Sequence, residues 1–136
     1  MYTPVHSRAT SAYRQVGVQS GIEGASPHVL IKMLFDGLVQ SLNAARGAMA
    51  RGDIPEKGRQ IGMAVRILDE GLKGGLDPAR GGELAANLGA LYDYCVARLT
   101  QANMRGDVTA VEEVLKLITP VADGWNQIAA APAGRA

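Results

Sequence analysis

Apolar residues recur at intervals of three and four positions through four consecutive stretches of the chain. This interval places them along one side of an α-helix, whereas a half-buried strand needs alternation at every second position. Ser, Gly, Asp and Pro, which favour turns and helix ends, separate the stretches. The pattern predicts an all-α protein of four amphipathic helices.

The first helix is predicted to begin at Ser26-Pro27 and to end near Arg51. Serine accepts an otherwise unpaired backbone N–H at the helix start, and proline fits the first turn because its missing N–H has no helical partner there. The predicted apolar stripe of this helix is Ile31, Phe35, Leu38, Leu42, Ala45 and Met49.

The second helix is predicted to follow Gly52-Asp53 directly and to end at Gly74-Gly75. Gly52 suits a left-handed C-cap and Asp53 suits the next N-cap, with Glu56 in the capping-box position. The stripe of this helix is Ile61, Val65, Leu68 and Leu72.

The third helix is predicted between Asp77-Pro78 and Arg105-Gly106-Asp107, and the fourth follows that turn. Pro120 removes one backbone donor from the fourth helix, which predicts a kink toward its Trp125 end. The two stripes are Leu84, Leu88, Leu91, Cys95, Leu99 and Ala102, then Val111, Leu115, Ile118, Ala122 and Trp125.

The turn sequence occurs twice, as AMARGDI at 48–54 and ANMRGDV at 102–108. Arg-Gly-Asp also suggests integrin adhesion, but a C-cap Gly followed by an N-cap Asp explains both copies as tight turns. Helices of about 20 to 25 residues joined by short turns predict an antiparallel four-helix bundle. We expect residues 1–24 to form a flexible N-terminal arm, 25–130 the bundle domain and 131–136 a frayed tail.

Charge and cysteine content exclude several classes of protein. The 14 basic residues nearly balance 13 acidic ones, so the net charge of +1 predicts no binding to nucleic acid or to an anionic membrane.

The single Cys95 forms no internal disulfide, and the N-terminus lacks the apolar segment of a signal peptide. No stretch approaches the roughly 18 apolar residues of a membrane span. These features predict a cytoplasmic protein without membrane insertion.

Polar residues are nearly absent from the predicted inward stripes, which argues against an enzyme, a metal site or a cofactor. Neither His6 nor His28 follows a Glu by three positions, as a di-iron bundle requires. His28 suggests a phosphotransfer module, but it falls in the first helical turn rather than on an exposed mid-helix face. Cys95 lies on an apolar stripe, so we expect a buried structural thiol rather than a nucleophile.

The first two helices carry more apolar residues than one core needs. Residues 29–35 are apolar on nearly every side of the helix, and Met63 and Ile67 lie beside the second stripe. These residues either cover helix flanks inside the bundle or form a surface for an amphipathic helix or extended apolar segment of a partner. Glycines within the predicted helices indicate either close helix packing or a modest stability that partner binding would raise.

Four parts of the chain together resemble the FliS family of flagellar secretion chaperones. They are GASPHVLIKMLFDGL (24–38), RGDIPEKGRQIGMAVRILDEGLKGGLD (51–77), GGELAANLGALYDYCVARLTQAN (81–103) and the late Trp125, and the resemblance covers about residues 10–128. It implies a cytoplasmic, non-enzymatic export chaperone. Such a chaperone binds the disordered C-terminal segment of flagellin, prevents premature polymerisation and aids delivery to the flagellar type III secretion apparatus. The export gate is a further candidate partner.

The resemblance also implies that the flagellin segment wraps around the bundle and that a tyrosine of the N-terminal arm lies against the hydrophobic surface. Tyr13 is in the matching position, and Phe35 stands where the family often has tyrosine. We expect a partner-binding surface formed by Tyr13, Leu30, Met33, Leu34, Ile61, Met63, Ile67, Asn87, Leu88, Tyr92 and Tyr94.

Two alternatives stay open for this surface. Several of its residues are equally well interpreted as ordinary core, and Tyr92 and Tyr94 lie about 200° apart around a helix, so only one of them can face a single groove. We expect the other to form a local hydrogen bond.

A helical adaptor for another secretion component is the alternative function, and the free protein is compatible with a monomer or a homodimer.

Overall fold

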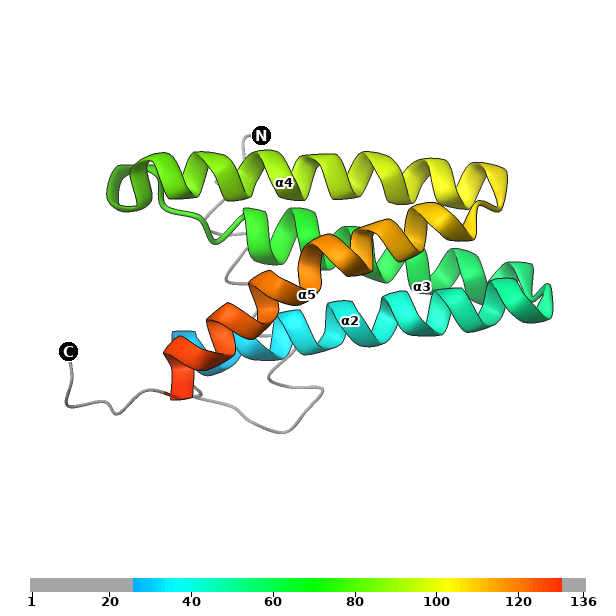
Figure 1. The fold of residues 1–136 in the computed structure, drawn as a ribbon, viewed down its shortest axis with the longest axis horizontal. Helices are drawn as coiled ribbons and strands as arrows, with labels where there is room; N and C mark the ends of the chain where they lie inside the picture. Colours follow the sequence, from blue (N-terminus) through cyan, green and yellow to red (C-terminus); the bar gives the residue numbers. More distant parts are fainter. Residues whose placement is uncertain (1–25, 131–136) are drawn as a thin grey trace, which may run out of the picture.

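A computed structural model describes residues 26–130, apart from the side chains of residues 129 and 130. The described part of the chain is helical between its turns and contains no strand, which confirms the all-α prediction (Figure 1). Its elements are α2 (Pro27–Arg51), α3 (Ile54–Arg66), η1 (Ile67–Lys73), α4 (Pro78–Arg105) and α5 (Val108–Ala130).

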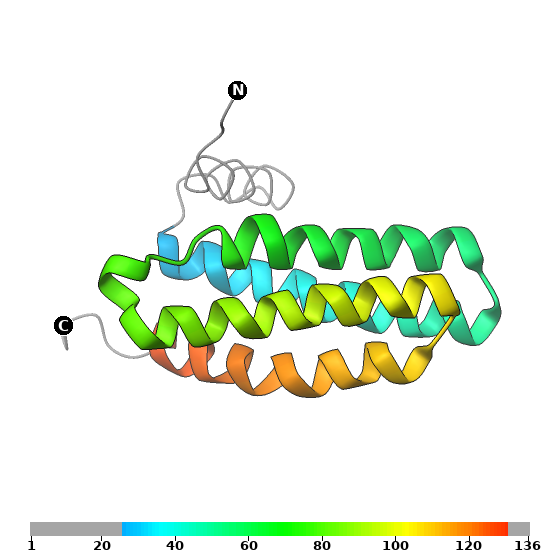
Figure 2. The same cartoon turned by 90° about the horizontal axis from the view of Figure 1, so that it is seen from above.

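The helices form a bundle of four rods, because η1 continues α3 without a break (Figures 1 and 2). α2 packs against α3, η1 and α5, whereas α4 packs against α3, η1 and α5. The backbones of α2 and α4 do not approach each other closely, nor do those of α3 and α5, so these pairs lie diagonally opposite each other. Short turns make consecutive rods antiparallel, as predicted.

The helix ends confirm the roles that the sequence predicts for the turn residues. The Ser26 hydroxyl accepts the backbone N–H of the residue three positions on, 3.3 Å away. Gly52 and Gly106 have φ angles of 71° and 65°, a left-handed conformation that strongly favours glycine. The carboxylates of Asp53 and Asp107 then accept backbone N–H groups at the start of the next helix.

The predicted capping box at the start of α3 is wrong in one half. The Glu56 carboxylate does not return to the backbone of Asp53 but accepts hydrogen bonds from Arg59 and Gln60. The Asp53 N–H already donates to the carbonyl of Ala48 at 2.8 Å. The preceding C-cap therefore satisfies the donor that Glu56 was expected to satisfy.

The second predicted helix changes conformation along its length, because η1 is a seven-residue π-helix. Gly71 of η1 lies so close to α2 that a β-carbon there would be 3.1 Å from the Leu34 side chain. A β-carbon on Gly37 of α2 would be 3.5 Å from the Ile67 side chain. These two glycines therefore support the interpretation of close helix packing.

The core consists mainly of residues from the four predicted stripes. Its largest fully buried side chains are Leu34, Leu38, Leu42, Ile61, Leu68, Leu99, Ile118, Val111, Val114 and Cys95. No helix in the described range is long and apolar enough to cross a bilayer.

The placement of Leu84 on the core stripe is wrong, because its side chain is 66% exposed. Gly82 interrupts the start of α4 with φ 52° and ψ −127°. The part of α4 that packs into the core begins only after this interruption. There the small side chain of Ala85 is buried in place of Leu84.

The far end of α5 is fixed to α2. α5 continues through Pro120 to Ala130. The indole Nε1–H of Trp125 donates to the His28 carbonyl at 3.1 Å, and the two rings stack with centroids 5.0 Å apart. α5 meets α4 near Gly106 and then crosses obliquely toward the start of α2 (Figure 1).

Candidate functional site

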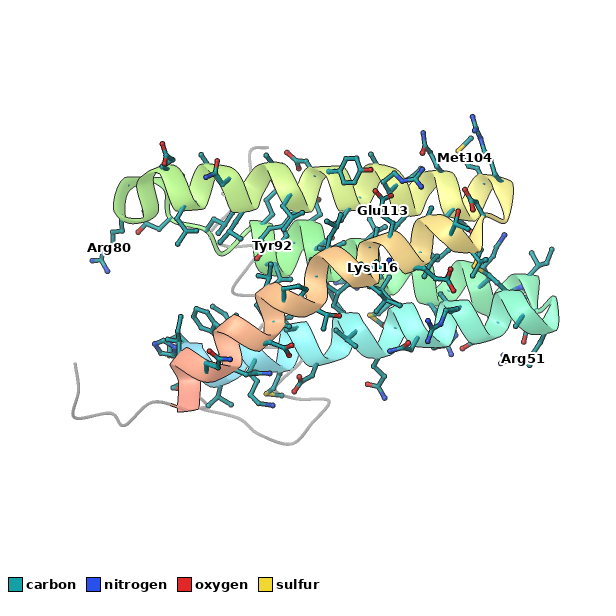
Figure 3. The ribbon with its side chains drawn as sticks, viewed as in Figure 1. Arg51, Arg80, Tyr92, Met104, Glu113 and Lys116 are labelled. Carbon is teal, nitrogen blue, oxygen red and sulfur yellow. The ribbon has the colours of Figure 1, made fainter. Side chains whose placement is uncertain are left out.

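Several large apolar side chains remain exposed on the described bundle, and they fall into separate groups. One group lies along the boundary between α4 and α5 and consists of Leu84 and Tyr94 on α4 and Ile128 on α5. Ile54 and Met104 lie near the Arg-Gly-Asp turns, and Figure 3 shows Met104 near the end of α4. The complete set among the described residues is Val29, Ile54, Met63, Leu84, Tyr94, Met104 and Ile128.

An apolar strip follows the boundary between α4 and α5, and we call it the α4–α5 seam. Its inner residues are partly buried against the core, whereas Leu84 and Ile128 at its open end are 66% and 60% exposed. Helical spacing places the members from each helix on one side of that helix. The seam consists of Leu84, Leu88 and Leu91 on α4 and Leu117, Val121 and Ile128 on α5.

A polar cluster closes the other end of the seam. The Tyr94 hydroxyl donates to Glu113 Oε2 at 2.7 Å, and Arg98 Nε donates to Glu113 Oε1 at 2.6 Å. Figure 3 shows Glu113 on the side of α5 that faces α4. Two hydrogen bonds lower the pKa of Glu113, the larger effect coming from Tyr94 and the smaller from Arg98. The bond between Tyr94 and Glu113 also raises the pKa of Tyr94. We call these three residues the Glu113 clasp.

The structure divides the predicted partner-binding residues between two helix pairs instead of one groove. Leu30 and Met33 on α2 are partly buried, and Met63 on α3 is exposed. On α4, Leu88 belongs to the seam, Tyr94 belongs to the Glu113 clasp, and Asn87 is exposed. Tyr13 lies outside the described residues.

Four of the predicted residues belong to the core, namely Leu34, Ile61, Ile67 and Tyr92. Their side chains are at most 8% exposed, so in this conformation they support a surface instead of forming it. Tyr92 is buried and Tyr94 is 45% exposed, which confirms that the two tyrosines face different directions. The hydrogen bond of Tyr94 is not the local one that was expected, because its hydroxyl donates to Glu113 on the neighbouring helix α5.

Sequence reasoning missed the seam because it assigned the three α4 members to a core stripe and the three α5 members to no stripe. Leu91 is partly buried between core and solvent, and Leu84 is exposed. Leu117 and Ile128 belong to no predicted stripe. The Gly81-Gly82 pair, which only Glu83 separates from Leu84, was the available signal, because paired glycines commonly interrupt a helix.

The described residues hold no arrangement suited to catalysis. The Cys95 thiol is buried, and burial raises its pKa to about 11, so it stays protonated near neutral pH. His28 is exposed and stacked on Trp125. In the described range, no group of three or more His, Cys, Asp and Glu side chains is placed to hold a metal ion.

The described surface of this helical bundle offers exposed and partly buried apolar side chains suited to contact with another protein. The sequence profile of the family "Flagellar protein FliS" matches residues 9–132. The chain belongs to the FliS family of flagellar secretion chaperones, which is not a family of enzymes.

Characterised relatives resemble the chain over nearly all of its length. The "Flagellar secretion chaperone FliS" of Salmonella typhimurium is 48% identical over 128 residues, covering 94% of this chain and 93% of the relative. The FliSB chaperone of Pseudomonas aeruginosa is 46% identical, with 89% and 95% of the two chains covered. The Escherichia coli FliS is 42% identical, with 93% of each chain covered.

Proposed function

We propose that this protein is a cytoplasmic export chaperone that binds the disordered C-terminal segment of flagellin. It keeps the segment from polymerising prematurely and aids its delivery to the flagellar type III secretion apparatus, with the export gate as a second partner. Membership in the FliS family over most of the chain carries the proposal.

The surface of the bundle gives this function a physical basis. A flagellin terminus that packs into a filament has to be apolar and helix-prone, so it needs apolar cover before assembly. The α4–α5 seam and the partly exposed Leu30, Met33 and Met63 offer that cover. We therefore expect the client to contact these side chains, with Tyr13 of the arm as a further contact.

Release of the client is as necessary as its capture. Ordering a disordered segment on binding costs about 2 to 5 kcal/mol or more of the interaction energy. This cost keeps the affinity below what the buried apolar area alone would provide, and it allows later transfer to the secretion apparatus.

The proposal is tested by titrating the full chain with the C-terminal segment of the flagellin from the same organism. We expect a binding heat by calorimetry and a gain of helix by circular dichroism, because the segment folds on an apolar surface. A peptide of the same composition in scrambled order is the control. Neither heat nor helix gain with the native segment would reject the proposal and favour a helical adaptor with another client.

A further inference from the structure

The solvent-facing side of α5 has a pattern that is symmetric about its buried Val114. Val114 is fully buried, so the opposite side of the helix faces solvent. Glu112 and Lys116 lie two positions before and after Val114, and Thr109 and Thr119 lie five positions before and after it. All four side chains are exposed. The pattern therefore repeats its threonines and inverts its charges when the helix is read in the opposite direction.

Helix geometry places these four residues on one strip. Successive residues are about 100° apart around a helix, so the four fall within about 80° of one another, on the side opposite Val114. We call this strip, formed by Thr109, Glu112, Lys116 and Thr119, the α5 face. α5 lies along an outer edge of the bundle (Figure 2), and Lys116 lies near the middle of this helix (Figure 3). A second helix can therefore approach the strip from solvent.

The two charges of the α5 face are poorly used within the chain. The Glu112 carboxylate is 4.0 Å from the Arg46 guanidinium of α2, and both side chains are about half exposed. Within the described range, the Lys116 ammonium forms no ion pair, although Glu112 precedes it by one helical turn. Both charges are thus left to interact with a partner.

A groove of about 820 Å³ runs beside the strip. Its lining includes Arg46 of α2 and the side chains of the α5 face, together with the exposed ring of Pro120. The groove is open to solvent and carries both signs of charge. A purely acidic or purely basic segment would meet a like charge there, whereas a partner with one charge of each sign in reversed order would not.

We propose that the α5 face binds the α5 face of a second copy of this chain, with the two helices antiparallel. A two-fold axis that passes through the level of Val114 brings Glu112 of each copy opposite Lys116 of the other. The same axis brings Thr109 of each copy opposite Thr119 of the other. This inference goes beyond the proposed function and does not depend on it.

The interface leaves the α4–α5 seam open. The seam residues Leu117, Val121 and Ile128 lie about 140° around α5 from the midpoint between Glu112 and Lys116. The α5 face itself extends only about 15 Å along the helix, which is short for a permanent interface. We therefore expect a weak dimer that forms with rising protein concentration and weakens with added salt.

The experiment measures self-association of the full chain by sedimentation equilibrium, with Lys116→Glu and Glu112→Lys as variants. Symmetry turns both attractive pairs into like-charge pairs in either variant, so each should self-associate roughly tenfold or more weakly than the unmodified chain. An equimolar mixture of the two variants should associate again, because every Glu then faces a Lys. Both positions are exposed, and circular dichroism checks that the variants fold.

The matched controls are Lys73→Glu and Asp93→Lys, which make the same changes of charge away from the α5 face. These residues form a 2.7 Å ion pair between η1 and α4. We expect both controls to self-associate as the unmodified chain does. Equal weakening in the controls would show that net charge acts instead of the proposed pairs.

Three further results would overturn the proposal. They are an unmodified chain that stays monomeric up to its solubility limit, variants that associate as well as the unmodified chain, and a mixture that does not regain association. The C-terminal flagellin segment should bind all these chains equally. If Lys116→Glu and Glu112→Lys bind it more weakly than the controls do, the α5 face belongs to the client and not to a second copy.

Discussion

Cys95 has a sulfur that would be reactive in another setting, and its surroundings remove that reactivity. It is buried in the core, and burial raises the pKa of its thiol to about 11. Only the thiolate is a good nucleophile, and its fraction near neutral pH is very small at this pKa. The position of Cys95 on an apolar stripe was sufficient to predict this role.

We predict that Cys95 reacts with a thiol reagent at pH 8 only after the protein unfolds. The native thiol is both protonated and inaccessible, whereas the unfolded chain exposes a thiol of ordinary pKa. The measurement is the rate of colour development with an aromatic disulfide reagent, with and without urea. Equal rates in the two conditions would show that the native thiol is open to solvent.

Glu113 is the residue whose charge has the clearest structural task. Hydrogen bonds from Tyr94 and Arg98 lower its pKa, so the folded protein binds the proton at this site less readily than the unfolded chain does. Ionised Glu113 therefore stabilises the folded protein at pH values above the ordinary pKa of glutamate. This stabilisation is lost as the pH falls through the lowered pKa of Glu113 in the folded protein.

We predict that Glu113→Gln lowers the midpoint of thermal unfolding at pH 7 and that this difference from the unmodified chain shrinks toward pH 3. The effect is small because the clasp is solvent-accessible. Thermal melts followed by circular dichroism across this pH range provide the measurement. Glu112→Gln is the control, since Glu112 forms only a 4.0 Å exposed ion pair with Arg46. A difference that persists unchanged at pH 3 would contradict the assigned role of the carboxylate.

At the scale of the helices, sequence patterns predicted most of what the structure contains. Ser26, Gly52 and Gly106 mark helix ends because capping depends on residues within one turn, which a sequence displays directly. The π-helix of η1 was not predicted, since it depends on how Gly71 meets α2, a contact distant in sequence. The exposure of Leu84 was missed for a related reason, because periodicity assumes that the helix continues unbroken across Gly82.

Gly71 and Gly62, both in the second rod, should respond in opposite directions to substitution by alanine. A β-carbon at position 71 would meet the Leu34 side chain at 3.1 Å, so Gly71→Ala should lower the free energy of unfolding by about 1 to 3 kcal/mol. At Gly62 nothing lies within 4 Å of the added carbon, so Gly62→Ala should raise it by about 0.5 to 1 kcal/mol. Urea denaturation followed by circular dichroism measures both. Equal effects of the two substitutions would contradict the close contact between η1 and α2.

At the scale of the whole molecule, one bundle has to provide both a stable core and an apolar surface for a client. The antiparallel bundle was predictable, because four stripes joined by short turns allow few other arrangements. The division of apolar residues between core and surface was harder to predict. Leu34 and Met33 are neighbours in one apolar run, yet one is fully buried and the other is partly exposed. The angle of each helix in the bundle decides this, and a single helical period does not specify that angle.

We expect residues 1–24 to compete with the client for this surface, and we predict that deleting them strengthens binding of the flagellin segment. The deleted residues include Tyr13, Val16 and Ile22, apolar side chains tethered to the bundle at a high effective concentration. If the arm covers the surface about nine-tenths of the time, its removal raises the apparent affinity about tenfold. Calorimetric titration of both chains with the same segment measures the change, and Tyr13→Ser in the full chain should reproduce part of it. An unchanged or weaker complex after deletion would show that the arm contributes to binding and does not compete with it.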